Sequence, residues 1–187
     1  MATGLRLLPA LQALASGGVV AYPTEAVYGL GCNPLDESAV ASVLAIKGRA
    51  ARKGLILIAA DQTQLLPLLR PLPPEWQDRL NATWPGPVTW LLPVADWVPD
   101  WLTGGRNTLA ARVTDHPIAA ALCHAWGGPL VSTSANRSGL PAARTALQVR
   151  SRLGQAVDAV VPGPTGNRQQ PSEIRDMASG RIIRPGG

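Results

Sequence analysis

Short apolar runs alternate with amphipathic stretches along this chain, and that alternation predicts its fold. The apolar runs are rich in aliphatic and β-branched residues, which favours buried strands at 19–22, 55–60, 88–92, 109–113, 129–131 and 157–161. Capping residues and prolines between them predict helices at 7–15, 36–47, 61–69, 73–85, 115–127 and 145–153. Residues 24–32 are expected as a polar loop and 172–184 as a β-hairpin. Strands alternating with helices are typical of a twisted, mixed α/β sheet with helices packed on it, so we predict a single domain over residues 1–187.

The predicted helix at 36–47 places a charged residue on its apolar side. Asp36 is a suitable N-cap, and Val40, Val43 and Leu44 form a stripe with the i, i+3, i+4 spacing of a buried helix face. Lys47 continues that stripe at i+7, which directs its side chain inward. A lysine near a helix C-terminus also suits the helix dipole. The dipole explains a cation at this end of the helix, but not its place on the apolar side.

Lys47 also opens the most basic stretch of the chain, residues 47–54. This stretch contains the only two lysines, Lys47 and Lys53, together with Arg49 and Arg52. A compact ammonium and a planar guanidinium bind anions differently, so a stretch that holds both suits a site that needs both. The alternative is a solvated basic turn between a helix and a strand. Arg112 adds a further cation, since it lies in an apolar strand where it needs either a structural anion or a bound ligand.

Composition and charge limit the class of protein. Of the 187 residues, 46% are hydrophobic and 16% are charged, as in a globular domain. The formal charge of +5 and a pI near 10.0 favour an anionic partner such as a nucleotide, RNA or phosphate. No apolar run approaches the ~20 residues that a membrane-spanning helix needs. The N-terminus lacks the pattern of a signal peptide, and Cys32 and Cys123 have no metal-ligand spacing, so we expect a cytoplasmic protein with reduced thiols.

Several familiar catalytic motifs are absent from the sequence. It has no Walker A sequence, no G-x-G-x-x-G and no G-x-S-x-G elbow. A serine hydrolase would need a histidine base, but His116 is expected at a helix N-terminus and His124 among apolar residues of the same helix. No cluster of His, Cys and Asp has the spacing of a metal site. Any nucleotide must therefore be held by scattered loops.

Hydroxyl-rich segments follow the predicted strands instead. Thr24 and Tyr28 follow the strand at 19–22, and Ser172 precedes the C-terminal hairpin. The strand at 129–131 leads into a polar run that holds Ser132, Thr133, Ser134 and Asn136. Small hydroxyls, an amide and basic side chains together suit phosphate oxygens and the charged ends of an amino acid. Each segment alone would be ordinary turn chemistry, and only their recurrence at strand ends favours a binding site.

Six short segments, taken together and in their order along the chain, are far more specific than any one motif. They are Tyr22-Pro-Thr-Glu-Ala-Val-Tyr-Gly-Leu-Gly-Cys32, Lys47-x-Arg49 with Lys53-Gly54, Trp84-Pro-Gly-Pro-Val-Thr89, Ala111-Arg-Val-Thr-Asp-His-Pro117, Ser132-Thr-Ser-Ala-Asn-x-Ser-Gly139 and Pro171-Ser-Glu-Ile-Arg-Asp176. Together they resemble the YrdC/TsaC family, the threonylcarbamoyl-AMP synthases of tRNA modification, and its short bacterial branch in particular. Two positions depart from the family pattern. Ala50 stands where many members have proline, which leaves the loop less rigid, and Ala26 stands where many have threonine, which removes a hydroxyl.

The resemblance implies a fold and a reaction. The fold is a YrdC-like α/β domain with a deep basic cavity, and the C-terminal extension of the longer branch is expected to be missing. The reaction converts L-threonine, bicarbonate or CO2, and ATP into threonylcarbamoyl-adenylate and pyrophosphate. ATP is then a substrate that carries its own Mg²⁺, because the sequence offers no dedicated carboxylate cage for a metal. Downstream threonylcarbamoyl-transfer proteins would use the product to modify an adenosine of tRNA.

The resemblance also assigns roles to individual residues. Lys47 and Arg49 are the expected catalytic residues, because cations fixed in a water-poor cavity offset the repulsion between a carbamate and ATP. The ATP-binding set is expected to be Lys47, Arg49, Lys53, Ser132, Ser134, Asn136 and Arg184. The threonine-binding set is expected to be Thr24, Arg112 and Ser172.

Two other functions remain open from the sequence. The pI of about 10.0 also fits a non-catalytic factor that binds double-stranded RNA or acts in ribosome maturation, and direct RNA contact is compatible with the synthase as well. An acyl or carbamoyl phosphate hydrolase is the third candidate, because the fold also occurs within larger carbamoyltransferases. Affinity that falls steeply with salt and ignores threonine would favour the RNA-binding alternative.

Overall fold

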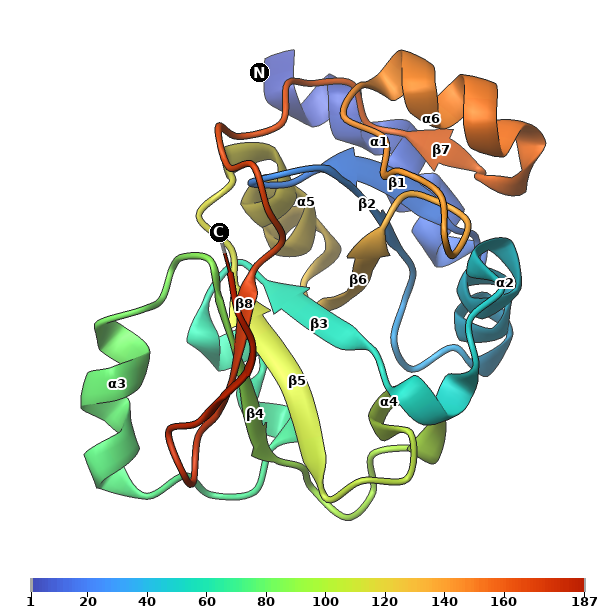
Figure 1. The fold of residues 1–187 in the computed structure, drawn as a ribbon. Coiled ribbons are helices and arrows are strands. Elements are labelled where there is room, and N and C mark those ends of the chain that lie inside the picture. The colour runs from blue at the N-terminus through green and yellow to red at the C-terminus, as the bar shows by residue number, and fades with distance from the viewer. Residues whose placement is uncertain (1, 187) are drawn as a thin grey trace.

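A computed structural model describes residues 2–186 and places a nine-stranded mixed sheet at the centre of that part of the chain (Figure 1). The sheet order is β7-β1-β2-β6-β3-β5-β4-β8-β9. The strands are β1 Val20–Pro23, β2 Tyr28–Gly31, β3 Ile56–Ala59, β4 Val88–Pro93, β5 Thr108–Val113, β6 Leu130–Ser134, β7 Ala159–Val160, β8 Glu173–Asp176 and β9 Ile182–Arg184. β3 pairs in parallel with β5 and antiparallel with β6, so the predicted mixed α/β sheet is confirmed.

Helices pack on the sheet and connect its strands. The α-helices are α1 Ala2–Ala15, α2 Glu37–Lys47, α3 Gln77–Asn81, α4 Asp100–Thr103, α5 Pro117–Trp126 and α6 Ala146–Leu153. Short 3₁₀ turns are η1 Ala51–Lys53, η2 Gln62–Gln64, η3 Leu66–Leu68, η4 Pro74–Trp76 and η5 Gly154–Ala156. Asp36 caps α2 as predicted, since its side chain accepts a hydrogen bond from the Ala39 amide. Among the helices of the described residues, none reaches the length and hydropathy of a membrane span.

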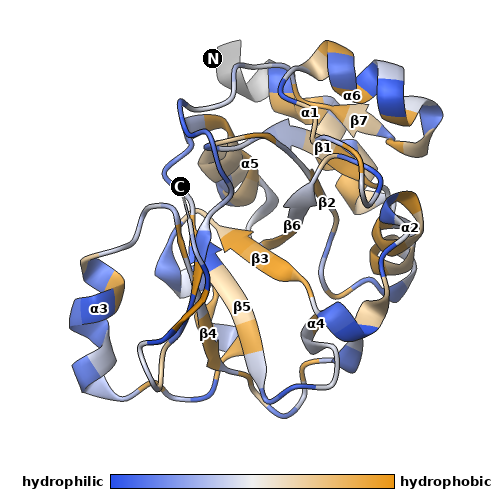
Figure 2. Cartoon of the chain, viewed as in Figure 1, coloured by the Kyte–Doolittle hydropathy of each residue, from blue (hydrophilic) through white to orange (hydrophobic). Residues whose placement is uncertain are grey.

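Alternate strand residues face opposite sides of the sheet, and each side has its own core. On one side, Ala21 and Leu57 pack in a cluster that includes residues of α2 and α6. On the other side, Val20, Tyr22 and Ile58 pack in a cluster with α1 and α5. Figure 2 shows β3 strongly hydrophobic and α3, which adds only Leu80 to the first cluster, mostly hydrophilic. The α1/α5 side of β3, β5 and β6 is the side on which the cavity described below opens.

One predicted helix is wrong and a second is shorter than predicted. Residues 61–69 form the two 3₁₀ turns η2 and η3 rather than one α-helix. Asp61 does cap the first turn, because its side chain accepts a hydrogen bond from the Gln64 amide, but Pro67 has no amide hydrogen with which to continue a helix. The helix predicted at 73–85 is also shorter, since η4 and α3 cover only 74–81.

The predicted loop at 24–32 contains a strand. β2 pairs antiparallel with β1 and with β6, and the turn between β1 and β2 is closed by hydrogen bonds from the Thr24 amide and hydroxyl to the Val27 carbonyl. Two glycines in β2 weaken its strand signal in the sequence. Gly29 is there because space is short: a Cβ at this position would lie 3.3 Å from both the Ser132 hydroxyl and a methyl group of Thr24.

Other element bounds also differ from the predictions. β6 continues to Ser134, so the hydroxyls of Ser132, Thr133 and Ser134 lie in the strand and only Asn136 lies beyond it. α1 begins at Ala2 rather than at residue 7, α4 has no predicted counterpart, and β7 is only two residues long. The C-terminal hairpin is confirmed as β8 and β9. Apart from the added α4, these differences move the ends of elements, and the main strands and helices follow one another along the chain as predicted.

Candidate active site

A cavity of about 630 Å³ opens on the α1/α5 side of the sheet. Its lining includes alternate residues of the central strands, namely Gly29, Ile56, Thr108, Ala110, Arg112, Ser132 and Ser134. Ile56 lies opposite both Ala110 and Ser132 in the strand pairing, so β3, β5 and β6 contribute a continuous surface. The remaining walls come from the end of α2, from η1, from β8 and β9, and from the segment between β7 and β8.

Positive charge dominates this cavity. The basic residues in its lining are Lys47, Arg49, Lys53, Arg106, Arg112, Arg168 and Arg184. Among the described residues that line it, Glu25 is the one carboxylate. A cavity with this excess of cations suits a ligand that carries several negative charges.

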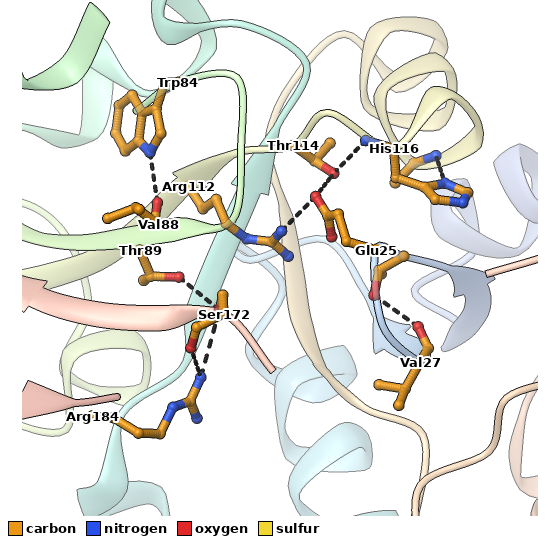
Figure 3. Close-up of polar contacts among 12 residues, drawn as sticks. Glu25, Val27, Trp84, Val88, Thr89, Arg112, Thr114, His116, Ser172 and Arg184 are labelled. Carbon is orange, nitrogen blue, oxygen red and sulfur yellow. Dashed lines mark hydrogen bonds and ion pairs between the residues drawn. The ribbon is translucent and has the colours of Figure 1, made fainter. Parts of the chain in front are cut away.

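Glu25 and Arg112 form a buried ion pair at one end of the cavity (Figure 3). Arg112 Nη1 lies 2.5 Å from Glu25 Oε1, and the two side chains are only 7% and 8% exposed. Thr114 donates a 2.6 Å hydrogen bond to the same carboxylate oxygen. Burial alone would raise the pKa of Glu25, but the charge and hydrogen bond of Arg112 outweigh it and lower that pKa to about 2. Arg112 is therefore structurally paired, its Nε is buried with no partner in the described residues, and the residue also forms part of the cavity lining.

His116 lies close to this end of the cavity without lining it. Its ring caps α5 by accepting a long 3.5 Å hydrogen bond from the Ala119 amide, and its Nε2 lies 3.1 Å from the Pro164 carbonyl. Burial lowers the pKa of His116, so a neutral ring that donates from Nε2 fits both contacts. The expected place of His116 at a helix N-terminus is confirmed. The expectation for His124 is wrong, because this residue lies exposed near the end of α5 rather than packed among apolar neighbours.

Lys47 is buried at the end of α2, as its place on the apolar stripe predicts. The residue is only 4% exposed, and its Nζ donates to the carbonyl and hydroxyl of Ser134 and to the carbonyl and side-chain oxygen of Asn136, at 2.5–3.2 Å. Three ammonium protons are thus shared among four protein oxygens. Burial, followed by the positive charge of Arg49, lowers the pKa of Lys47 to about 8. These contacts hold the end of β6 in place, and the ammonium adds positive charge to the cavity.

Arg49 is held by the loop that follows α2. Its Nη2 donates to the Gly54 carbonyl at 3.0 Å, while its Nε is buried with no partner among the described residues. Gly54 has a φ of +66°, and a Cβ there would lie 2.9 Å from the Thr103 carbonyl oxygen and 3.1 Å from Arg106 Nη1. Only glycine fits both the backbone conformation and the space. The loop therefore presents Arg49 in a fixed orientation.

The hydroxyls predicted to bind threonine have local partners as well. Thr24, which lines the cavity, donates its hydroxyl proton to the Val27 carbonyl, so its oxygen can act toward a ligand only as an acceptor. Ser172 Oγ lies 3.0 Å from Thr89 Oγ1, and Arg184 Nη2 donates to the Ser172 carbonyl at 2.7 Å (Figure 3). Burial lowers the pKa of Arg184, and the charges of Arg49 and Arg112 lower it further. Arg184 therefore lies within the electrostatic reach of both ends of the cavity.

Every site residue predicted from the sequence lines this one cavity. They are Thr24, Lys47, Arg49, Lys53, Arg112, Ser132, Ser134, Asn136, Ser172 and Arg184. Tyr28 does not join them, because its hydroxyl donates to the Gly163 carbonyl and so holds the segment that follows β7. Sequence reasoning missed Glu25, although it lies beside Thr24 in the first matching segment. It also missed Arg106 and Arg168, which no local pattern distinguishes from solvated arginines.

Among the described residues, the cavity lining offers no ready set of ligands for a metal ion. Within residues 2–186, no group of three or more His, Cys, Asp or Glu side chains is arranged to bind one. Glu25, the carboxylate of the lining, is occupied by Arg112 and Thr114. The protein residues alone therefore do not fit a resident divalent cation, and oxygen ligands for one would have to come largely from a bound substrate.

Comparison with known proteins places the chain in a family. Residues 12–186 match the model of the Sua5, YciO and YrdC proteins, whose description is "Telomere recombination". The threonylcarbamoyl-AMP synthase of Halorhodospira halophila is 55% identical over 179 residues, which are 96% of this chain and 94% of the relative. That of Pseudomonas aeruginosa is 51% identical over 185 residues, 99% of this chain and 100% of the relative. The structure of P. abyssi Sua5 complexed with L-threonine matches with a TM-score of 0.91 at 35% identity, and covers 99% of this chain and 55% of that one. On these grounds, the chain belongs to the Sua5/YciO/YrdC family.

Proposed function

We propose that this protein is a threonylcarbamoyl-AMP synthase, which makes threonylcarbamoyl-adenylate and pyrophosphate from L-threonine, bicarbonate or CO2, and ATP. The observation that carries the proposal is that all the predicted ATP and threonine residues line a single cavity rich in cations. Relatives that are more than half identical over nearly their full length bear this name. That likeness favours the synthase over a non-catalytic RNA-binding factor.

The end of the cavity near Glu25 suits the amino acid. L-Threonine carries a carboxylate, an ammonium and a hydroxyl, and this end offers partners for all three. The guanidinium of Arg112, which lines the cavity, can donate to the carboxylate or to the carbamate made from the amine. The Thr24 hydroxyl oxygen and Ser172 can accept from the ammonium or bind the side-chain hydroxyl. Because Glu25 holds the guanidinium in place, the threonine binds to a site that is already formed.

The end of the cavity near α2 and β6 suits the nucleotide. Ser132 brings a hydroxyl to this end, while Ser134 and Asn136 hold Lys47, whose ammonium adds positive charge. Arg49, Lys53 and Arg184 bring further cations. Mg²⁺ enters bound to the ATP phosphates, because the lining offers it no free carboxylate. The carbamate and ATP are both anions, and these fixed cations lower the free energy needed to bring them together.

Further steps of the pathway lie outside the cavity. Threonylcarbamoyl-adenylate is a reactive mixed anhydride, so transfer proteins are expected to collect it and use it on an adenosine of tRNA. The net charge of +5 also allows direct contact with RNA, and a cytoplasmic location fits a tRNA-modifying enzyme.

The decisive experiment is to identify the product. Purified protein is incubated with ATP, L-threonine and bicarbonate, and the mixture is analysed by mass spectrometry. We expect threonylcarbamoyl-adenylate and pyrophosphate in equal amounts, and neither when threonine or bicarbonate is omitted. ADP and phosphate in place of these products, or pyrophosphate release that does not depend on threonine, would contradict the proposal.

A further inference from the structure

One end of the cavity gathers cations that no carboxylate balances. It lies between η1 and the turn that precedes β5, and Arg49, Lys53 and Arg106 line it. Among the described residues, none of these three side chains forms an ion pair. Burial and the nearby charge of Arg106 both lower the pKa of Arg49. Cations held close together without counter-charges favour the binding of an anion between them.

Arg106 is oriented but not saturated by its contacts with the protein. Its Nη1 donates to the Thr103 carbonyl at 3.0 Å and its Nη2 donates to the Arg52 carbonyl at 2.9 Å. A guanidinium has five N–H donors in a fixed plane, so three remain for a ligand. The two carbonyl contacts fix the plane, and Arg106 is itself part of the cavity lining. A guanidinium held in this way is prepared for bidentate contact with a phosphate.

We propose that Arg106 is a catalytic residue that binds the terminal phosphates of ATP and the pyrophosphate that leaves. The proposal rests on the proposed synthase function. Thr108, Ala110 and Arg112 face the cavity from β5, and Arg106 lines it just before the strand begins. At about 3.3 Å per residue, Thr108 and Arg112 are roughly 13 Å apart along β5, and Arg106 lies two residues before Thr108. With the amino acid at the Arg112 end, the α-phosphate lies between the two arginines and the terminal phosphates point toward Arg106.

The chemistry explains why a cation is useful there. A carbamate oxygen forms a bond to the α-phosphorus, and the bond from that phosphorus to the α,β-bridging oxygen breaks. The bonding electron pair remains on the bridging oxygen, so negative charge builds up on pyrophosphate as it leaves. A guanidinium already directed at that position stabilises this charge without having to reorganise.

The assignment is tested by measuring separately how tightly the protein binds the two parts of ATP, which are pyrophosphate and AMP. Calorimetric titration with inorganic pyrophosphate and with AMP gives one dissociation constant for each part. We expect Arg106→Gln to weaken pyrophosphate binding by on the order of tenfold, as for loss of a charge-assisted hydrogen bond, and to change AMP binding by less than about twofold. The matched control is Arg152→Gln, since Arg152 also donates to a backbone carbonyl, that of Pro141, but does not line the cavity. We expect this control to leave both constants unchanged.

A second variant separates ligand binding from a purely structural contact. Arg106→Lys keeps the charge but loses the planar fork, so the ratio of pyrophosphate to AMP affinity should fall by about threefold. If Arg106→Gln does not fold, this ratio carries the test. Equal losses for AMP and pyrophosphate, or pyrophosphate binding at the parent's strength, would overturn the role of Arg106. A parent protein that neither binds nor releases pyrophosphate would instead contradict the synthase function itself.

Discussion

The two ends of the cavity hold positive charge in different ways. At the Glu25 end, Arg112 is paired with a carboxylate before any substrate binds, and both side chains are buried. At the Arg106 end, Arg49, Lys53 and Arg106 have no carboxylate partner among the described residues. The first end is thus complete in the free protein, whereas the second is completed by its ligand.

The two ends should therefore affect different properties of the protein, namely its folding stability and its affinity for anions. A buried ion pair stabilises the fold only while both partners are charged, because either charge alone would be buried without compensation. A cluster of like charges instead lowers the stability of the free protein and raises its affinity for anions. Changes at the Glu25 end should therefore alter folding first, and changes at the Arg106 end should alter phosphate binding first.

The largest expected effect comes from breaking the ion pair. Glu25→Gln leaves the Arg112 charge buried and unpaired, and we expect it to reduce the free energy of unfolding at pH 7 by roughly 3–5 kcal/mol in urea titrations. Glu173→Gln is the control, because its partner Arg175 is more exposed and such pairs contribute less than about 1 kcal/mol. A loss no larger than that of the control would show that the buried pair does not stabilise this end.

The same pair gives the parent protein a pH dependence. The pKa of Glu25 falls from an ordinary value of 4.5 to about 2 on folding, so its contribution is present above pH 4.5 and is lost as the pH falls toward 2. The loss over that window is on the order of 3 kcal/mol. Glu25→Gln should lack this part of the acid transition.

Loss of the buried lysine should mainly affect catalysis. We expect Lys47→Ala to lower the rate of pyrophosphate release by 10²–10³-fold, or about 3–4 kcal/mol, because it removes a fixed charge and frees the end of β6. It should also reduce stability by about 1–3 kcal/mol, since oxygens of Ser134 and Asn136 lose their donor. The chain's other lysine provides the control: Lys53→Ala should slow the reaction by less than about tenfold. Equal losses of rate for the two lysine variants would contradict the catalytic role expected of Lys47.

The smallest expected effect sharpens the Arg106 end. Gly54→Ala forces a Cβ against the Thr103 carbonyl and Arg106 Nη1 at a positive φ, which should cost about 1–2 kcal/mol of stability. Because the Gly54 carbonyl also holds Arg49, pyrophosphate affinity should fall severalfold while threonine affinity stays the same. Gly105→Ala is a useful comparison, since Gly105 also has a positive φ but a Cβ there meets no atom within 4 Å. If both substitutions weakened pyrophosphate binding equally, backbone strain rather than contact with Arg106 would be the cause.

Local signals account for most of what the sequence predicted. Apolar runs and caps such as Asp36 depend on nearby residues, and so they gave the main strands and α2. Helical spacing correctly turned Lys47 inward, although its contact with Ser134 and Asn136 spans 87 and 89 residues and could not be derived from spacing.

The errors and omissions depend on contacts distant in the sequence. β2 is rich in glycine and is stabilised by pairing on both of its edges, which no local pattern shows. The sequence left Arg112 with two alternatives, and the choice between them depends on Glu25, which is 87 residues away. Arg106 has no feature of its own in the sequence, because its importance comes only from the position of η1 against the turn before β5.

The alternation of β5 has a consequence for how this enzyme can change. Side chains on a strand switch faces at every residue, so inserting or deleting one residue between Thr108 and Ala110 would turn either Thr108 or Arg112 away from the cavity. The length of β5 is therefore constrained along with the identity of Arg112. With Thr24 and Ser172 as the proposed amino-acid contacts, a change of specificity should arise by substitution in their loops, with the spacing between the two substrates kept.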